Sequence, residues 1–163
     1  MNGARITVNR AWAFRHPSGY TPDTRESGLY ISPHGTIAMA QGQMAIRQSI
    51  LLLLSTSPGE RVMRPDYGCH LRRLVFLPND ATTAGLAMHY IRQSLEHWEP
   101  RVEVVRILTG EDVQGRAGGP HQAGSGLSQP QENFLNILIE YRVRATHLVD
   151  SVHFVFNLTG ETY

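Results

Sequence analysis

Apolar side chains recur at helical spacing in the first half of the chain. The members of this stripe are Ala45, Ile46, Ile50, Leu51, Leu52, Leu53 and Leu54. The pattern predicts a helix over residues 43–55 that is buried over most of its girth. We expect it to end before Pro58-Gly59, because proline cannot continue the helical hydrogen-bond ladder and glycine accepts a left-handed backbone.

A second helical stripe predicts a long helix over residues 81–98, and a short one is expected over 70–77. The apolar positions of the long helix are Ala84, Ala87, Met88, Ile91, Leu95 and Trp98. Asn79 or Asp80 precedes it and can accept hydrogen bonds from its first amides. Pro100 ends it, since the residue before a proline is pushed out of helical geometry.

Three stretches predict strands, over residues 102–109, 134–143 and 152–158. In the last two, every second residue is apolar, which places these side chains on one face. The segment 110–132 is rich in glycine, proline, serine and glutamine, and we expect a flexible inter-strand loop without apolar anchors. The order predicts an α+β fold with two long helices packed on a mainly antiparallel C-terminal sheet. Such a sheet has edges, and an open edge can accept a strand from another chain.

Residues 1–37 lack such patterns and predict an extended, irregular N-terminal arm before a single α+β domain over 38–163. Residues 5–8 could form a short strand, and Trp12 and Phe14 place two aromatic rings close together. Two interpretations stay open. The aromatic rings pack onto the core, or the arm docks on a neighbouring subunit.

Composition narrows the range of functions. The formal charge of +1 over 163 residues is close to neutral, so the chain lacks the overall positive charge typical of nucleic-acid-binding proteins. The eight histidines form no metal-binding motif, so we expect no metal and no cofactor. The single cysteine, Cys69, excludes an internal disulfide and suits a reducing compartment. No segment resembles a signal peptide or the ~18 to 20 apolar residues of a membrane span, so we expect folding in the cytoplasm.

Two charged segments are candidate contact sites. The loop after the first helix carries Glu60, Arg61, Arg64 and Asp66, with Pro65 and Gly68 fixing its turn. It is either an intramolecular ion-pair network or a surface for a partner, and both can hold together. Glu99-Pro100-Arg101 follows the second long helix. Without further information, this corner is a helix stop with two solvated charges.

These segments carry a family resemblance. The runs 46–50 (IRQSI), 58–69 (PGERVMRPDYGC) and 99–101 (EPR) resemble the GPW-type, lysozyme-like baseplate wedge proteins. These are the sheath initiators of contractile phage tails, type VI secretion baseplates and phage-tail-like injection particles. The similarity is strongest over residues 41–108, and the PGERxMRPxxG run is its most specific part.

The resemblance implies a structural protein with no catalytic residues, assembled in the cytoplasm and then part of a particle. Its partners would be other baseplate wedge subunits and the sheath protein, in a ring of six copies, with the central hub or tube as a further candidate. The implied anchor to the wedge is Glu99-Pro100-Arg101, with Arg101 projecting from the surface rather than into the core. The charged loop is a second contact, and the open sheet edge would pair with arms of the first sheath ring.

Two alternatives come from other classes. A cell-wall glycosidase needs two carboxylates flanking a cleft. The candidates are Glu60, Asp66, Glu96, Glu99 and Glu103, and none has an apolar setting suited to a general acid. Serine catalysis lacks support, since no serine lies in a nucleophile-elbow context. An adaptor domain unrelated to contraction is the other alternative.

Overall fold

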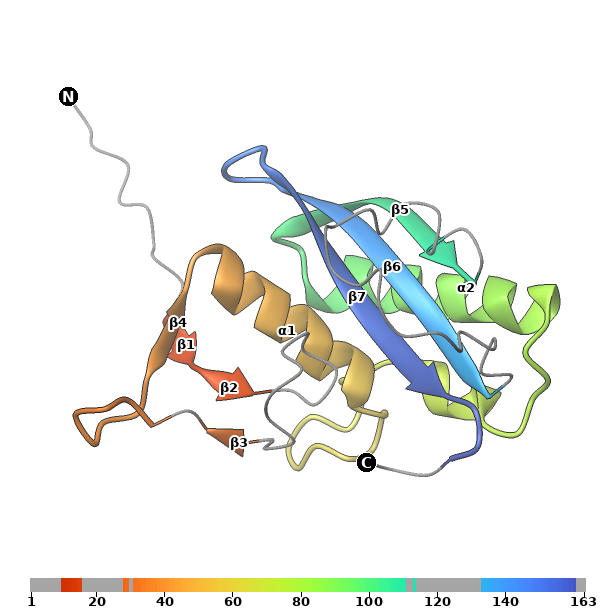
Figure 1. Ribbon diagram of the computed structural model, residues 1–163, viewed down its shortest axis with the longest axis horizontal. Coiled ribbons are helices and arrows are strands. Elements are labelled where there is room, and N and C mark those ends of the chain that lie inside the picture. The colour runs from red at the N-terminus through yellow and green to blue at the C-terminus, as the bar shows by residue number, and fades with distance from the viewer. Residues whose placement is uncertain (1–9, 16–27, 30, 111–112, 114–132, 161–163) are drawn as a thin grey trace, which may run out of the picture.

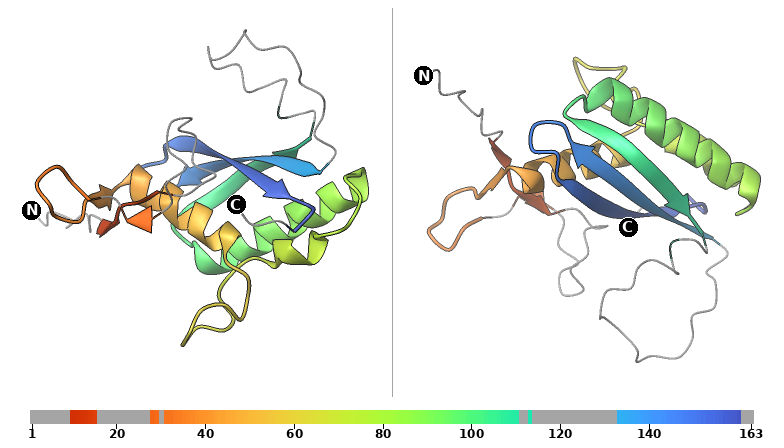
Figure 2. Two further views of the ribbon diagram at one scale, coloured as in Figure 1. Left: turned by 60° about the horizontal axis from the view of Figure 1, so that its bottom comes forward. Right: turned by 90° about the horizontal axis from the view of Figure 1, so that it is seen from above.

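The computed structural model describes residues 10–15, 28–29, 31–110, 113 and 133–160. Its C-terminal region is a three-stranded antiparallel sheet in the order β5-β6-β7, with both long helices on one face (Figures 1 and 2). The elements are α1 (Gln43–Ser55), the 3₁₀ helix η1 (His70–Leu74), α2 (Ala81–Trp98), β5 (Val102–Thr109), β6 (Phe134–Val143) and β7 (Val149–Asn157). The predicted α+β fold is therefore confirmed. No helix in these ranges is long and apolar enough to cross a membrane.

The core lies between the helices and one face of the sheet. Alternate residues of β6 are buried there: Leu135, Ile137, Ile139, Tyr141 and Val143. The helices bury their predicted stripes against this face, and Ile50, Leu53, Ile91 and Leu95 are almost fully buried. Each such side chain contributes about 1.5 to 3 kcal/mol. The opposite sheet face is half polar, because Asn136, Glu140 and Arg142 alternate with the buried residues of β6.

Local chemistry sets the element boundaries. Asp80 caps α2 by accepting a hydrogen bond from the Thr83 amide at 2.7 Å. The short helix predicted over 70–77 ends earlier, since Val75 is extended and Phe76 adopts a positive φ of 69°. β7 begins at Val149 rather than at residue 152. Within this extension Asp150 accepts a hydrogen bond from the buried Tyr141 hydroxyl at 3.0 Å.

The predicted inter-strand loop contains an unexpected anchor. Val113 is only 3% exposed, so the expectation that this loop has no apolar anchor is wrong at that residue. The remainder of the predicted loop, 114–132, lies outside the described residues.

The described part of the N-terminal arm forms short antiparallel pairs. β1 (Arg10–Trp12) pairs with β4 (Met39–Gln41), and β2 (Phe14–Arg15) pairs with β3 (Gly28–Leu29). Gln48 of α1 holds this segment: its side chain donates to the Trp12 carbonyl at 2.8 Å and accepts from the Phe14 amide at 2.7 Å. Trp12 and Phe14 do not pack into the core, since both side chains are exposed. The strand predicted over 5–8 lies outside the described residues.

Candidate functional site

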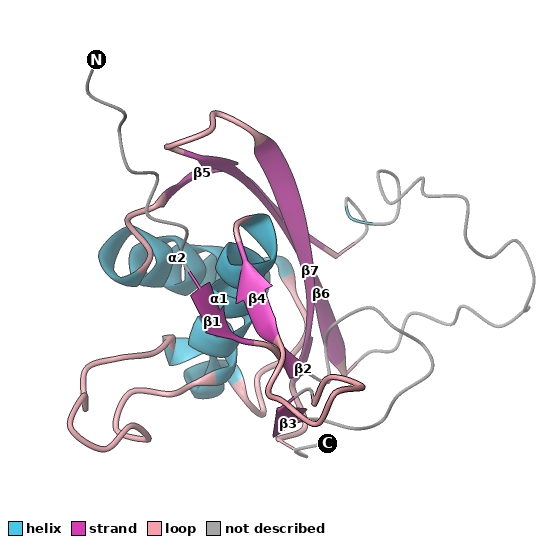
Figure 3. Ribbon diagram, turned by 90° about the vertical axis from the view of Figure 1, so that its left-hand side faces the viewer, coloured by secondary structure: helices cyan, strands magenta, loops and turns pink. Residues whose placement is uncertain are grey.

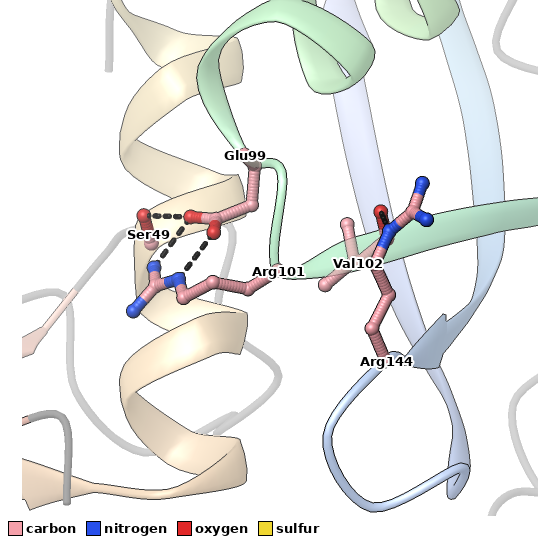
Figure 4. Close-up of polar contacts among 5 residues, drawn as sticks. All are labelled: Ser49, Glu99, Arg101, Val102 and Arg144. Carbon is pink, nitrogen blue, oxygen red and sulfur yellow. Dashed lines mark hydrogen bonds and ion pairs between the residues drawn. The ribbon is translucent and has the colours of Figure 1, made fainter. Parts of the chain in front are cut away.

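The corner between α2 and β5 is built around a buried carboxylate. Glu99 caps the C-terminus of α2 and is only 3% exposed. Its carboxylate receives the Arg101 guanidinium as a two-pronged ion pair, through Nε and through Nη2 at 2.5 Å (Figure 4). The Ser49 hydroxyl of α1 donates to the same carboxylate at 2.5 Å. The corner therefore ties the end of α2 to the middle of α1.

The main chain of the corner is also fixed. The Arg144 amide donates to the Arg101 carbonyl at 2.9 Å, and the Arg144 side chain donates to the Val102 carbonyl at 3.4 Å (Figure 4). Pro100 stands between Glu99 and Arg101 and is exposed. The backbone of Arg101 is therefore fixed by Arg144, and its guanidinium is fixed by Glu99.

Two expectations about this corner are wrong. Glu99 is not a solvated charge, and Arg101 does not project freely, because its fork closes on Glu99 within the same chain. The hydrogen bond to Glu99 raises the pKa of Arg101 further. Yet the Arg101 side chain is 35% exposed, and Nη1 has no partner among the described residues. The Nη1 edge of the Arg101 guanidinium is therefore available to bind a partner.

A hollow of about 770 Å³ opens beside this edge. It lies between α1, the charged loop and the corner. Its charged lining residues are Arg10, Arg61, Arg101 and Glu99. Since Glu99 and Arg101 neutralise each other, the hollow carries an excess of positive charge suited to a carboxylate.

The charged loop is fixed by its backbone. Gly59 donates to the Pro65 carbonyl at 2.7 Å, and Cys69 donates to the Thr56 carbonyl at 2.8 Å. Gly68 adopts φ +135°, and a β-carbon there would lie 2.4 Å from the Thr56 carbonyl oxygen. Only glycine therefore fits where the loop closes on the end of α1.

The loop was expected to form an intramolecular ion-pair network or a surface for a partner. Its charged residues differ in this respect. Glu60 is satisfied within the chain, since it accepts from Arg72 at 2.7 Å and from the Ser57 amide at 2.8 Å. Arg61 lies over the Tyr67 ring, 4.1 Å from its centroid, rather than in an ion pair. Arg64 and Asp66 are exposed and form no ion pair with any described residue. The intramolecular network thus covers Glu60 alone.

Aromatic packing links the loop to the corner. The rings of Tyr67 and Trp98 lie 5.2 Å apart and are tilted by 59°, and both residues line the hollow. Burial raises the pKa of the Tyr67 hydroxyl, so this group stays neutral. Ser49, Tyr67 and Trp98 were not predicted as site residues. Tyr67 and Ser49 lie inside the runs that carry the family resemblance, which was the available signal.

The two edges of the C-terminal sheet differ. β5 has an irregular register between Val104 and Arg106, and it carries exposed charges at Glu103 and Arg106. β7 pairs with β6 in unbroken register, and its single ionisable carboxylate, Asp150, is hydrogen-bonded to Tyr141 and to the Ser151 amide. Bulges and charges are the usual protection of an edge against pairing. β7 lacks both.

Backbone alternation shows which groups β7 presents. The Val143 amide donates to the Leu148 carbonyl at 2.9 Å, and the Leu158 amide donates to the Asn133 carbonyl at 2.8 Å. These contacts flank β7, so its even-numbered residues bond to β6 and its odd-numbered residues point their amides outward. His153 and Val155 therefore present N–H and C=O groups along the outer edge of the sheet.

The hollow does not have the geometry of a glycosidase site. Among the described residues that line it, Glu99 is the single carboxylate, and both its oxygens are bonded to Arg101 or Ser49. The other candidates, Glu60, Asp66, Glu96 and Glu103, are exposed and do not line it. A pair of carboxylates flanking a bound sugar is therefore not assembled here.

Comparisons with known proteins agree with this architecture. The family model described as baseplate wedge protein gp25 matches residues 40–148. A crystal structure of a protein from Geobacter sulfurreducens described as a tail lysozyme is 31% identical, with a TM-score of 0.60. The match covers 78% of this chain and all of that one. A subunit of the anti-feeding prophage baseplate is 19% identical with a TM-score of 0.52, and the match covers 93% of this chain and 87% of that one. No curated protein matches the sequence.

Proposed function

The chain belongs to the gp25 family of baseplate wedge proteins, and from that premise we propose that it is a structural joint between the wedge and the first ring of the contractile sheath. It is assembled in the cytoplasm into a particle, and it works by geometry rather than by catalysis. Two features of the structure support the proposal. The Glu99-Pro100-Arg101 corner holds Arg101 rigidly beside a positively charged hollow, and β7 is an edge strand with an unbroken register.

The Glu99-Pro100-Arg101 corner is the wedge anchor in this proposal. Glu99 acts within the chain: it orients the guanidinium, while Ser49 holds the carboxylate in place. Arg101 then offers its exposed Nη1 edge to a carboxylate or to helix C-terminal carbonyls of another wedge subunit. Arg61 lines the same hollow, and Arg64 and Asp66 lie on the same loop without an ion-pair partner in the described structure. Glu60 keeps the loop in shape rather than touching the partner.

The β7 edge is the sheath contact in this proposal. An extended arm of a sheath subunit would add to the sheet beside β7 through main-chain hydrogen bonds at His153 and Val155. Such bonds do not depend on particular side chains, so the link can persist while the sheath subunit changes orientation. Six copies would serve a six-fold baseplate, as in the six-fold symmetrised anti-feeding prophage baseplate.

Proline tests the strand pairing directly. Val155→Pro removes an outward N–H but leaves the β6 ladder intact, because proline is tolerated on the open side of an edge strand. Val155→Thr is the matched control, since it keeps both the amide and the branched shape. Baseplates that contain Val155→Pro but recruit no sheath, beside sheathed Val155→Thr particles, would support the proposal. Normal sheaths on Val155→Pro baseplates would exclude β7 as the edge.

A glycosidase is the second candidate, favoured by the description of the Geobacter sulfurreducens relative as a tail lysozyme. A turbidity assay with purified peptidoglycan distinguishes the two. The structural proposal expects no clearance by the purified chain. Clearance that disappears in Glu99→Gln but persists in Val155→Pro would establish the enzyme instead.

A further inference from the structure

The hollow beside the Arg101 corner is lined by segments that lie far apart in the sequence. The charged loop and the end of α2 form one side of it, and α1 forms its floor. The N-terminal arm also lines the hollow, through Arg10 and Ala11 of β1. β1 pairs with β4, which leads into α1, and both strands lie against α1 (Figure 3). The arm is therefore part of the site assigned to the wedge anchor.

Two consecutive side chains of α1 hold the two sides of the hollow. Ser49 holds the corner through its hydrogen bond to the buried carboxylate. Gln48 holds the arm, since its side chain donates to the Trp12 carbonyl at 2.8 Å and accepts from the Phe14 amide at 2.7 Å. These bonds fix the strand that carries Arg10. Gln48 is therefore placed to act on the site through the position of Arg10.

The hollow contains more positive charge than the chain itself neutralises. Three guanidinium groups line it, those of Arg10, Arg61 and Arg101. Among the described lining residues Glu99 is the single carboxylate, and it pairs with Arg101. Arg10 and Arg61 form no ion pair with any described residue, and Arg61 lies over the Tyr67 ring. Two positive charges therefore remain, and covering them with a partner that lacks negative charge would be costly.

This excess charge distinguishes between the two ligands that Arg101 alone could bind. The C-terminus of a helix carries only about half a negative charge, so it would leave Arg10 and Arg61 unpaired once the hollow was covered. Two carboxylates would match the remaining charge, and a guanidinium group binds a carboxylate through paired hydrogen bonds. The volume of about 770 Å³ is also large enough for several side chains of a partner.

We propose that the hollow binds a segment of another wedge subunit that carries two carboxylates, and that Gln48 is a positioning residue that places Arg10 for this contact. The carboxylates pair with the guanidinium groups of Arg10, Arg61 and Arg101. The inference rests on the proposed wedge anchor. It specifies the chemistry of the partner, and it makes the N-terminal arm a part of the anchor.

A chemical cross-link tests the contact, because the chain contains no lysine. Arg10→Lys or Arg61→Lys keeps the positive charge and introduces the single side-chain amine of the chain. A carbodiimide couples this amine to a carboxylate only where the two groups are in contact. In isolated baseplates, both variants should cross-link to aspartates or glutamates of the same segment of another wedge subunit. Arg92→Lys, exposed on α2 outside the hollow, is the matched control and should give no such product.

Gln48→Ala distinguishes a positioning role from a general loss of structure. Combined with Arg10→Lys, it should lower the cross-link yield at least about fivefold, which is the effect of losing about one hydrogen bond. Combined with Arg61→Lys, it should leave the yield nearly unchanged, because the hydrogen bonds of Gln48 hold the arm and not the loop.

Three results would overturn the proposal. These are the absence of cross-links from both lysine variants, cross-links to two unrelated segments, and a Gln48→Ala effect that is equal in the two backgrounds. Failure of the proposed function is seen separately. Cross-links to a wedge segment, in particles whose sheath is joined through a different protein, would contradict the sheath joint and keep this site. A wedge subunit against Arg101 without any cross-link would keep the joint and contradict the acidic segment.

Discussion

Arg101→Ala would leave the Glu99 carboxylate, in a residue only 3% exposed, with the Ser49 hydroxyl as its remaining side-chain partner. Breaking a fully buried ion pair costs about 3 to 5 kcal/mol. The Arg101 side chain is 35% exposed, so water replaces part of what is lost, and we expect about 1 to 3 kcal/mol. For a chain of this size that lowers Tm by about 2 to 12 °C.

Urea and thermal melts of matched variants measure this cost. Arg101→Lys keeps the charge but cannot bond to Glu99 through two nitrogens at once. Its stability should therefore lie between those of wild type and Arg101→Ala. In the double variant Glu99→Gln/Arg101→Ala no charge is stranded, so its loss should be smaller than the sum of the two single losses. An Arg101→Ala melt equal to wild type would refute the reasoning, because Glu99 would then not depend on Arg101. Binding to other wedge subunits must be compared below the variant's own melting temperature, so that folding and assembly are separated.

Four further outcomes follow from burial and backbone geometry. Gly68→Ala should lower Tm by several degrees, because the new β-carbon meets the Thr56 carbonyl; an unchanged melt would show that the loop adjusts freely. Leu53→Ala should cost about 2 to 5 kcal/mol in urea melts, and a neutral result would place it outside the core. Burial raises the pKa of Cys69, so native protein should react with a disulfide reagent at least about 100-fold more slowly than denatured protein, and rapid native labelling would contradict this. Burial lowers the pKa of His153 below 6.5, so protonation favours the unfolded state, and the free energy of unfolding should fall as pH drops from about 7 to about 5. The fall should be smaller in His153→Gln, and equal slopes would remove His153 as its cause.

The helices and the sheet could be predicted because each leaves a periodic pattern in the sequence. The stripe ending at Leu54 and the alternation from Leu135 to Val143 define the buried faces without any tertiary knowledge. Val113 could not be predicted in the same way, because a single valine in a polar segment has no periodic neighbours. The pairing of β1 with β4 was missed for a related reason: the strands are only three residues long, and Gln48 contributes contacts from another element.

The contacts within the Glu99-Pro100-Arg101 corner could not be predicted from the sequence. Glu99 and Arg101 are separated by one proline, and their charges alone indicate two solvated groups. In the structure Glu99 is buried instead, because α1 packs against it and the Ser49 hydroxyl, fifty positions earlier in the chain, donates to its carboxylate. Arg61 was likewise expected in an ion network, whereas it lies over the ring of Tyr67. The partners of these charged side chains depend on packing between distant segments of the chain. A single sequence does not show which segments pack together.

A cryo-electron-microscopy reconstruction of the native particle tests the central proposal most directly. The chain should lie in the baseplate with another wedge subunit against the exposed edge of Arg101. An extended strand from the first sheath ring should continue the sheet beside His153 and Val155. A particle in which the β7 edge is bare and the first sheath ring joins the baseplate through a different protein would contradict the account.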